Sequence, residues 1–281
     1  MIKFLYSVID AILPFQWAEL EFMKNALLAI LLVSAVFGML GTMIVNNKMA
    51  FFSDALGHGA FTGVAVGSIM GILSPIHGAI AFSIAFSILI TVVKNKSKTS
   101  TDTIIGVFSS IAISAGLVLL SVGGKNINKY SNYLYGDLLS ITPSDLILLL
   151  IAFVGVLLLW LLLFNQMLLI SVNQSLARSR GINTVVVETI FTSVIAIIVT
   201  VGIQWVGLLL INSLLVLPAA AARNVSVNVR QYHLLSVLFA LFSGISGLIL
   251  SFYWNSTTGA TIVLISACIY FLTLALKNKV G

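Results

Sequence analysis

Two side chains that can bind a metal ion, Asp54 and His58, stand four residues apart in the mostly apolar stretch 51–63. On a helix this spacing places them one turn apart on one face, with about 5–6 Å between their Cβ atoms. A carboxylate oxygen and an imidazole nitrogen can then meet one cation. This ligand pair suits Zn²⁺ or Mn²⁺, with Fe²⁺ as a further choice, so the spacing predicts a transition-metal site on a helix.

The same residues also allow a purely structural interpretation. Ser53 or Asp54 would cap the start of the helix, and His58 would be a hydrogen-bonded interior residue. Two ligands are too few for a tetrahedral metal site, so a cation would need further donors. A symmetric homodimer would present this helix twice and supply two Asp and two His. The residues alone leave the metal-binding and the structural interpretations open.

The helix that carries the pair is expected to have a packing side and a weakly polar side. On the packing side, glycines recur every fourth residue at positions 59, 63, 67 and 71. Small residues at this spacing let a neighbouring helix approach closely. On the Asp/His side, the face continues through Thr62, Ala65 and Ser68. This pattern favours an element that lines a pathway.

The composition indicates that these residues act inside a membrane. Of 281 residues, 60% are hydrophobic and 8% are charged, whereas a soluble domain carries about 25% charged residues. The mean hydropathy is +1.15. At about 20 residues per spanning helix, the chain holds roughly eight to ten spans and leaves little room for a fused ATPase, receptor or enzyme domain. The sequence therefore predicts an all-α polytopic membrane protein.

Short polar breaks divide the chain into apolar runs. We expect nine runs, give or take one, at 23–45, 51–73, 76–93, 103–122, 144–164, 184–203, 206–222, 232–253 and 258–276. Residues 1–21 hold acidic residues and a proline among aromatics, which favours an interfacial segment, and residues 22–281 form the membrane domain. Lys and Arg at 94–98, 178–180, 223–230 and 277–279 fall on one side, which is predicted to be cytoplasmic.

The remaining ionisable residues have structural interpretations. Asp102 and Asp145 are expected to start helices. Glu188 lies near Arg178 and Arg180 in the sequence, which favours a salt bridge or snorkelling. Gln204 and Asn212 could offer polar contacts along a path, as could Glu188 itself. The single cysteine, Cys268, lies in an apolar run, so neither an intrachain disulfide nor a cysteine metal site is expected.

Known enzyme motifs are missing from the sequence. It has no HExxH, no GxSxG and no P-loop, so the chain is not expected to be an enzyme, and ATP hydrolysis would need another polypeptide. The net charge of +6 comes from basic residues at the ends of apolar runs, where they set membrane orientation. Nucleic acid is therefore not an expected partner.

Several motifs together resemble the permease subunits of the zinc, manganese and iron ABC importers, the ABC-3 family. They are 53–59 with 63–67, then 135–139, then 206–210 and 217–222, and the resemblance covers about residues 20–276. It implies eight to nine transmembrane helices in a type II, cobalamin-importer-like permease fold in the bacterial cytoplasmic membrane. It also implies that Asp54 and His58 are metal ligands in the translocation path.

The resemblance implies partners as well. They are a second copy of this permease, two copies of a cytoplasmic ABC ATPase and an extracytoplasmic metal-binding protein, with no tightly bound cofactor. Three tyrosines of the predicted outer loop, Tyr130, Tyr133 and Tyr135, belong either to a membrane-interface belt or to the platform for that binding protein.

Permeases of this family contact their ATPase through a short cytoplasmic helix. The segment 171–182 fits by position, because it follows the fifth predicted span and carries charge, small residues and a terminal glycine. The residues expected to make the contact are Asn173, Gln174, Leu176, Ala177, Arg178 and Gly181. Relatives often place an acidic residue near position 173 or 174, and this chain has none there.

Two other functions compete with a divalent-metal importer. A permease for a siderophore or cobalamin shares the architecture, but it needs a wide cavity rather than an Asp/His pair. A stand-alone secondary cation transporter or channel would move metal without an ATPase and would leave the segment 171–182 unexplained. The choice between zinc and manganese stays open, because carboxylate and imidazole accept both.

Overall fold

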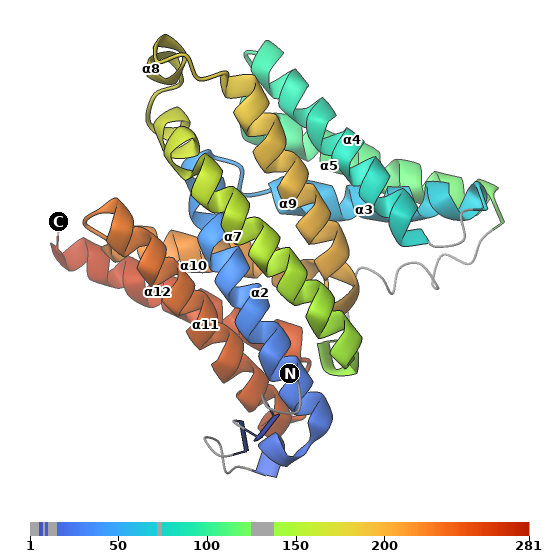
Figure 1. Ribbon diagram of the computed structural model, residues 1–281, viewed down its shortest axis with the longest axis vertical. Helices are drawn as coiled ribbons and strands as arrows, with labels where there is room; N and C mark the ends of the chain where they lie inside the picture. Colours follow the sequence, from blue (N-terminus) through green and yellow to red (C-terminus); the bar gives the residue numbers. More distant parts are fainter. Residues whose placement is uncertain (1–5, 8, 11–15, 72–74, 125–137, 281) are drawn as a thin grey trace. The chain divides into compact units, whose positions relative to one another are not determined.

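The computed structural model describes residues 6–7, 9–10, 16–71, 75–124 and 138–280, and these residues are mostly helical. The long helices are α2 (Glu21–Asn46), α3 (Phe52–Ile69), α4 (Pro75–Lys96), α5 (Thr101–Val122), α7 (Pro143–Val172), α9 (Thr184–Val206), α10 (Leu208–Val225), α11 (Val229–Trp254) and α12 (Thr258–Val280) (Figure 1). The short ones are α8 (Gln174–Ser179) and the 3₁₀ turns η1 (Gln16–Glu19) and η2 (Leu138–Ser140).

Eight helices of the described part are long and apolar enough to cross a membrane, and α3 is not among them. The run 51–73, predicted as a ninth span, does form a helix, but α3 carries an aspartate, a histidine and four glycines. Thirteen of its eighteen residues are buried. Since the chain itself covers α3, this helix needs less apolar surface than one that faces lipid.

The chain forms two compact units. One comprises residues 43–136 and 158–212, and the other comprises residues 1–42, 137–157 and 213–281. The first unit holds α3 to α5, α8 and α9, together with the last turn of α2, the second half of α7 and the first turn of α10. The predicted metal ligands and the predicted coupling segment both belong to this first unit.

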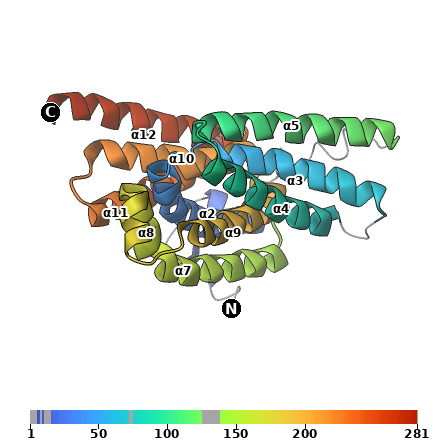
Figure 2. The same ribbon diagram turned by 90° about the horizontal axis from the view of Figure 1, so that it is seen from above.

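Within the first unit, α3 packs against α4, α5 and α9 (Figure 2). The predicted packing stripe is confirmed for three of its glycines. A Cβ at position 63 would lie 2.7 Å from the Cα of Ala79, and one at position 59 would lie 2.9 Å from Phe86. A Cβ on Gly78 of α4 would lie 3.0 Å from the Cα of Gly67. Helix α4 therefore approaches α3 to backbone contact.

The fourth glycine of the predicted stripe, Gly71, lies after the end of α3. Its φ of +70° places it in a left-handed turn, and an added Cβ would have no heavy atom within 4 Å. It ends the helix and contributes nothing to the contact with α4.

The Asp/His face does not stay open along the whole of α3. Thr62 donates hydrogen bonds to the carbonyl oxygens of His58 and Ala112, the second of which is on α5. Ala65 is buried in a cluster with Phe61, also of α3, and with Leu120 of α5. The expectation that Thr62 and Ala65 line a pathway is therefore wrong for this chain, because α5 covers them.

The second unit holds α11, α12, most of α2 and parts of α7 and α10. Small residues again set the helix contacts: a Cβ on Gly38 of α2 would lie 2.8 Å from the Cα of Val237 on α11. The Ser236 hydroxyl donates to the Gly38 carbonyl oxygen over 2.6 Å. Near the start of the chain, Asp10 forms an ion pair with Lys24 at 2.6 Å. An interfacial position of residues 1–21 stays a prediction.

Part of the predicted outer loop lies outside the described residues. This applies to Lys125 and Lys129, to Tyr130, Tyr133 and Tyr135, and to Asp137 of the third family motif.

Candidate metal site

Asp54 and His58 face each other on α3, as their spacing predicts. The Asp54 Oδ2 lies 3.5 Å from the His58 Nε2. The N-cap position of α3 is Phe51, and no side chain caps the helix start. The expectation that Ser53 or Asp54 caps α3 is therefore wrong. The Asp54 carboxylate is directed into the site instead.

Two residues from distant parts of the chain hold the Asp54 carboxylate. The Asn212 Nδ2 donates a hydrogen bond to Oδ1 over 3.0 Å. The Ser109 hydroxyl of α5 donates to Oδ2 over 3.4 Å. Of these two partners, only Asn212 was predicted from the sequence to contribute a polar contact along a path, and its contact with Asp54 was not predicted. Nothing in the sequence marked Ser109.

The separation of the two ligand atoms fits a shared cation. Two donors about 2.0–2.1 Å from a zinc ion at a tetrahedral angle lie roughly 3.3–3.4 Å apart. The observed 3.5 Å is close to that value, so one ion could bind both side chains with little movement. The side chains of His58 and Asp54 are 19% and 39% exposed, and an ion can therefore reach them.

The described residues supply an incomplete ligand set. Among the described residues, no three Asp, Glu, His or Cys side chains come close enough to hold a metal ion. The Nδ1 of His58 is buried and has no hydrogen-bond partner in the described part of the chain. A bound ion would need donors beyond the Asp54/His58 pair.

Glu188 lies in a second polar cluster, whose hydrogen bonds and ion pair involve none of the residues of the predicted site. It is 4% exposed, and its carboxylate pairs with the Lys94 ammonium of α4 at 3.5 Å. The amide of Asn95 donates to the same carboxylate over 3.0 Å. The predicted salt bridge exists, but its partner is Lys94 rather than Arg178 or Arg180. The contact between α4 and α9 brings together residues that are far apart in the sequence.

The predicted coupling segment contains a short helix, α8. Asn173 caps its start by accepting from the Leu176 N–H over 3.1 Å. Gly181, with a φ of +79°, ends it. Hydrogen bonds from Ile182 to Ala177 and from Gly181 to Arg178 complete a Schellman motif.

The α8 helix is exposed but anchored. Ala177 is fully buried, while Asn173, Leu176 and Arg178 are exposed. Gln174 donates over 3.3 Å to Asn95, which in turn bonds Glu188. A polar chain therefore connects α8 with the buried ion pair between α4 and α9.

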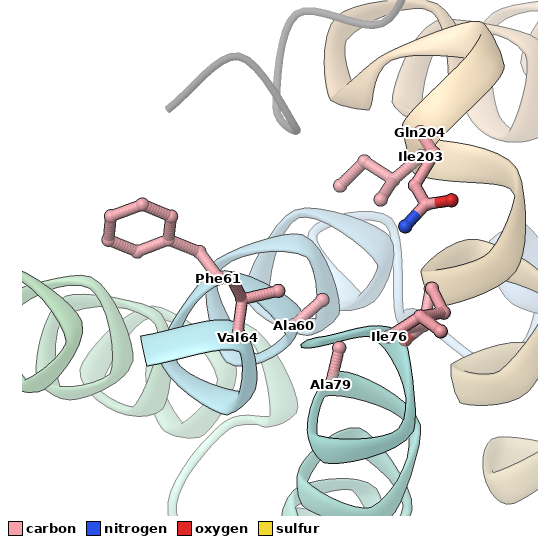
Figure 3. A pocket seen from close by; sticks show the side chains of 8 residues that line it. Ala60, Phe61, Val64, Ile76, Ala79, Ile203 and Gln204 are labelled. Carbon is pink, nitrogen blue, oxygen red and sulfur yellow. The ribbon is translucent and has the colours of Figure 1, made fainter. Parts of the chain in front are cut away.

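Gln204 takes no part in the Asp54 cluster. With Ile203 of α9, it lines a pocket against Ala60 and Val64 of α3 and Ala79 of α4. Figure 3 shows the two α9 side chains extending toward the side chains of α3 and α4. Because the walls are almost entirely apolar, the pocket offers no ligand set for a cation.

The two aspartates predicted to start helices do so. Asp102 lies in the first turn of α5, and its neighbour Ser100 is the capping residue. Asp145 lies in the first turn of α7 and accepts from the Thr142 N–H over 3.0 Å. The Asp145 carboxylate thus binds the backbone at the start of its helix, whereas the partners of Asp54 are side chains.

In the described part of the chain, eight span-length helices and a largely buried helix with a carboxylate–imidazole pair define a polytopic helical permease. The chain matches the ABC 3 transport family over residues 19–277 and belongs to it. It is a permease subunit of a metal ABC importer and a multi-pass protein of the bacterial cytoplasmic membrane.

Two relatives match most of this chain and are named as metal transport proteins. The chain is 32% identical to the high-affinity zinc uptake system membrane protein ZnuB of Buchnera aphidicola subsp. Schizaphis graminum, over 88% of this chain and 94% of that protein. It is 28% identical to the manganese transport system membrane protein MntC of Listeria monocytogenes, over 94% of this chain and 93% of that protein.

A solved structure shares both sequence and fold with this chain. PsaBC from Streptococcus pneumoniae in complex with Fab matches with a TM-score of 0.76 at 27% identity. The match covers 97% of this chain and 95% of that chain. The two chains therefore share one fold over nearly their whole lengths.

Proposed function

We propose that this chain forms the translocation path of an ATP-driven importer for Zn²⁺ or Mn²⁺, as a homodimer. The observation that carries the proposal is the Asp54/His58 pair, whose ligand atoms lie 3.5 Å apart on the interior helix α3. Relatives named as zinc and manganese transport proteins support this choice of cargo. Fe²⁺ has the same ligand preferences and is a third candidate.

The two ligands compensate for different effects of removing an ion from water. The Asp54 carboxylate offsets the charge of the cation, and the His58 imidazole replaces a lost water ligand. A second copy of α3 brings another carboxylate and another imidazole, which together make four donors, the number that tetrahedral zinc requires. The transported ion is thus held by side chains of both copies.

The energy for transport comes from a separate ATPase in this proposal. Each of two copies of a cytoplasmic ATPase contacts the α8 segment of one permease chain through Asn173, Gln174, Leu176, Arg178 and Gly181. Ala177, which was predicted to belong to this contact, is fully buried and anchors α8 instead. The exposure of α8 and its polar connection through Gln174 and Asn95 to the α4/α9 ion pair support this role. Movement of α8 shifts the population between states open to either side. An extracytoplasmic metal-binding protein delivers the ion.

Metal accumulation in cells tests the site. We expect Asp54→Ala and His58→Ala each to abolish accumulation of Zn²⁺ or Mn²⁺ while the assembled complex stays in the membrane. Matched controls are Asp102→Ala and His77→Ala, which change the same residue types at exposed helix starts and should leave accumulation intact. Normal accumulation by both site variants would end the proposal.

A second experiment tests the energy source. Reconstituted permease is combined with its ATPase partner, either intact or carrying a substitution that blocks ATP hydrolysis. We expect metal uptake into vesicles only with the intact partner. Equal uptake with the inactive partner would show that the chain works without ATP.

A further inference from the structure

We propose that Asn212 is a third side chain of the cation site, which positions the Asp54 carboxylate through its amide N–H and offers its amide oxygen to the ion. This inference rests on the proposed function, because it assigns a further residue to the same site. Asn212 lies 158 positions from Asp54 in the sequence, and only the fold brings the two together.

The path of the chain around Gly207 places Asn212 at the site. Gly207 separates α9 from α10 and has a φ of +80°, which residues with a Cβ rarely adopt. Helix α10 starts directly after it, and Leu208 sits against Gly57 of α3, where a Cβ would collide with the leucine side chain.

Asn212 follows Leu208 by four residues, so the two share one face of α10. While Leu208 covers Gly57, Asn212 reaches Asp54, which lies three residues earlier on α3. The two helix starts therefore cross with a fixed register. In this register, Gly57 leaves space for Leu208 of α10, and Asn212 contacts the Asp54 carboxylate.

The orientation of the Asn212 amide follows from its partner. Its nitrogen donates to Asp54 Oδ1 over 3.0 Å, and a flipped amide would bring two acceptor oxygens together. The amide oxygen must then face elsewhere. It is buried and has no hydrogen-bond partner among the described residues.

The His58 Nδ1 is likewise buried and lacks a partner in the described part of the chain. Two unsatisfied polar atoms in one small cluster are costly unless a further ligand satisfies them. A cation satisfies the amide oxygen directly. Amide and carboxylate oxygens are hard donors, which suit Mn²⁺ better than Zn²⁺, so Asn212 should favour binding of manganese.

Metal titration of the purified permease–ATPase complex tests the proposal. The probes are Mn²⁺, followed by electron paramagnetic resonance, and Zn²⁺, followed by calorimetry. Asn212→Leu keeps the approximate size but can neither donate nor bind a cation. We expect it to weaken Mn²⁺ binding by about 10–100-fold, the range typical for groups that orient metal ligands, and to weaken Zn²⁺ binding less.

Asn212→Asp distinguishes the two parts of the proposed role. It loses the N–H donor but keeps an oxygen ligand and adds a negative charge, so it should bind Mn²⁺ at least as tightly as wild type. If it binds as weakly as Asn212→Leu, the oxygen is not a ligand and the inference fails. Wild-type Mn²⁺ affinity in Asn212→Leu would also overturn it.

The matched control is Asn224→Leu, which changes the same residue type further along α10, where the amide contacts Thr273. It should bind both metals like wild type. If Asp54→Ala and His58→Ala also bind like wild type, the proposed function fails. If Asn212→Leu binds metal like wild type while Asp54→Ala and His58→Ala do not, the Asp54/His58 site stands without Asn212.

Discussion

The buried ion pair between Lys94 and Glu188 allows a quantitative test of how α4 and α9 are held together. Its charges lie 3.5 Å apart, and the two side chains are 17% and 6% exposed. At an effective dielectric constant of about 20, the attraction is about 5 kcal/mol before the cost of desolvation is subtracted. Removing one partner leaves the other charge buried, which typically costs about 3–5 kcal/mol.

We therefore expect Glu188→Leu to lower the free energy of unfolding by about 3–5 kcal/mol. The double variant Lys94→Met with Glu188→Leu should stay within about 1 kcal/mol of wild type, because replacing a whole buried pair by apolar residues is often neutral. In the double variant Asn95 keeps one acceptor, since its amide also bonds the Thr91 carbonyl oxygen over 2.9 Å.

Denaturant titration of the permease in detergent measures these differences. Glu21→Leu is the control, because it removes an exposed carboxylate from the first turn of α2 and should cost no more than about 1 kcal/mol. The reasoning is refuted if Glu188→Leu unfolds like wild type, or if the double variant is as unstable as the single one.

Four further predictions concern α3, α8 and the chain turn before α10. Gly63→Leu should greatly reduce the yield of folded protein, because a Cβ there would lie 2.7 Å from an α4 backbone atom. Gly106→Leu should not, because a Cβ at position 106 would have no heavy atom within 4 Å. The yield and the melting temperature of both variants test this prediction. Gly207→Ala should lower stability by about 1–3 kcal/mol in denaturant titration, because its φ is +80°; unchanged stability contradicts this. Asn173→Ala should remove the cap of α8, at about 1 kcal/mol locally, and reduce transport per ATP hydrolysed; a normal ratio argues against coupling through α8. Metal binding at His58 should fall as the pH is lowered, because only the neutral imidazole binds a cation; equal Mn²⁺ affinity at pH 5 and pH 7.5 contradicts this.

The features that sequence reasoning predicted correctly are local ones. The four-residue spacing of Asp54 and His58 fixes their common face on any helix, and the glycine stripe fixes a packing side. Both depend only on helix geometry, so no tertiary information was needed. The expected end of α8 at Gly181 also followed from local backbone preferences.

Features that depend on distant contacts could not be predicted in the same way. Glu188 pairs with Lys94 and not with the arginines nearer in sequence, because α4 packs along α9. Ser109 meets Asp54 only through the contact of α3 with α5. The glycine stripe predicted one packing side for α3, but nothing in the sequence indicated that α5 would also cover Thr62 and Ala65.

In the proposed importer, Asp54 and His58 bind the transported cation, and two copies of the chain contribute to one site. Metal analysis of the purified permease–ATPase complex, held with an inactive ATPase after loading with Zn²⁺ or Mn²⁺, tests this most directly. The account predicts one ion for every two permease chains, and none in His58→Ala. An unchanged metal content in His58→Ala, or one ion for every chain, would contradict it.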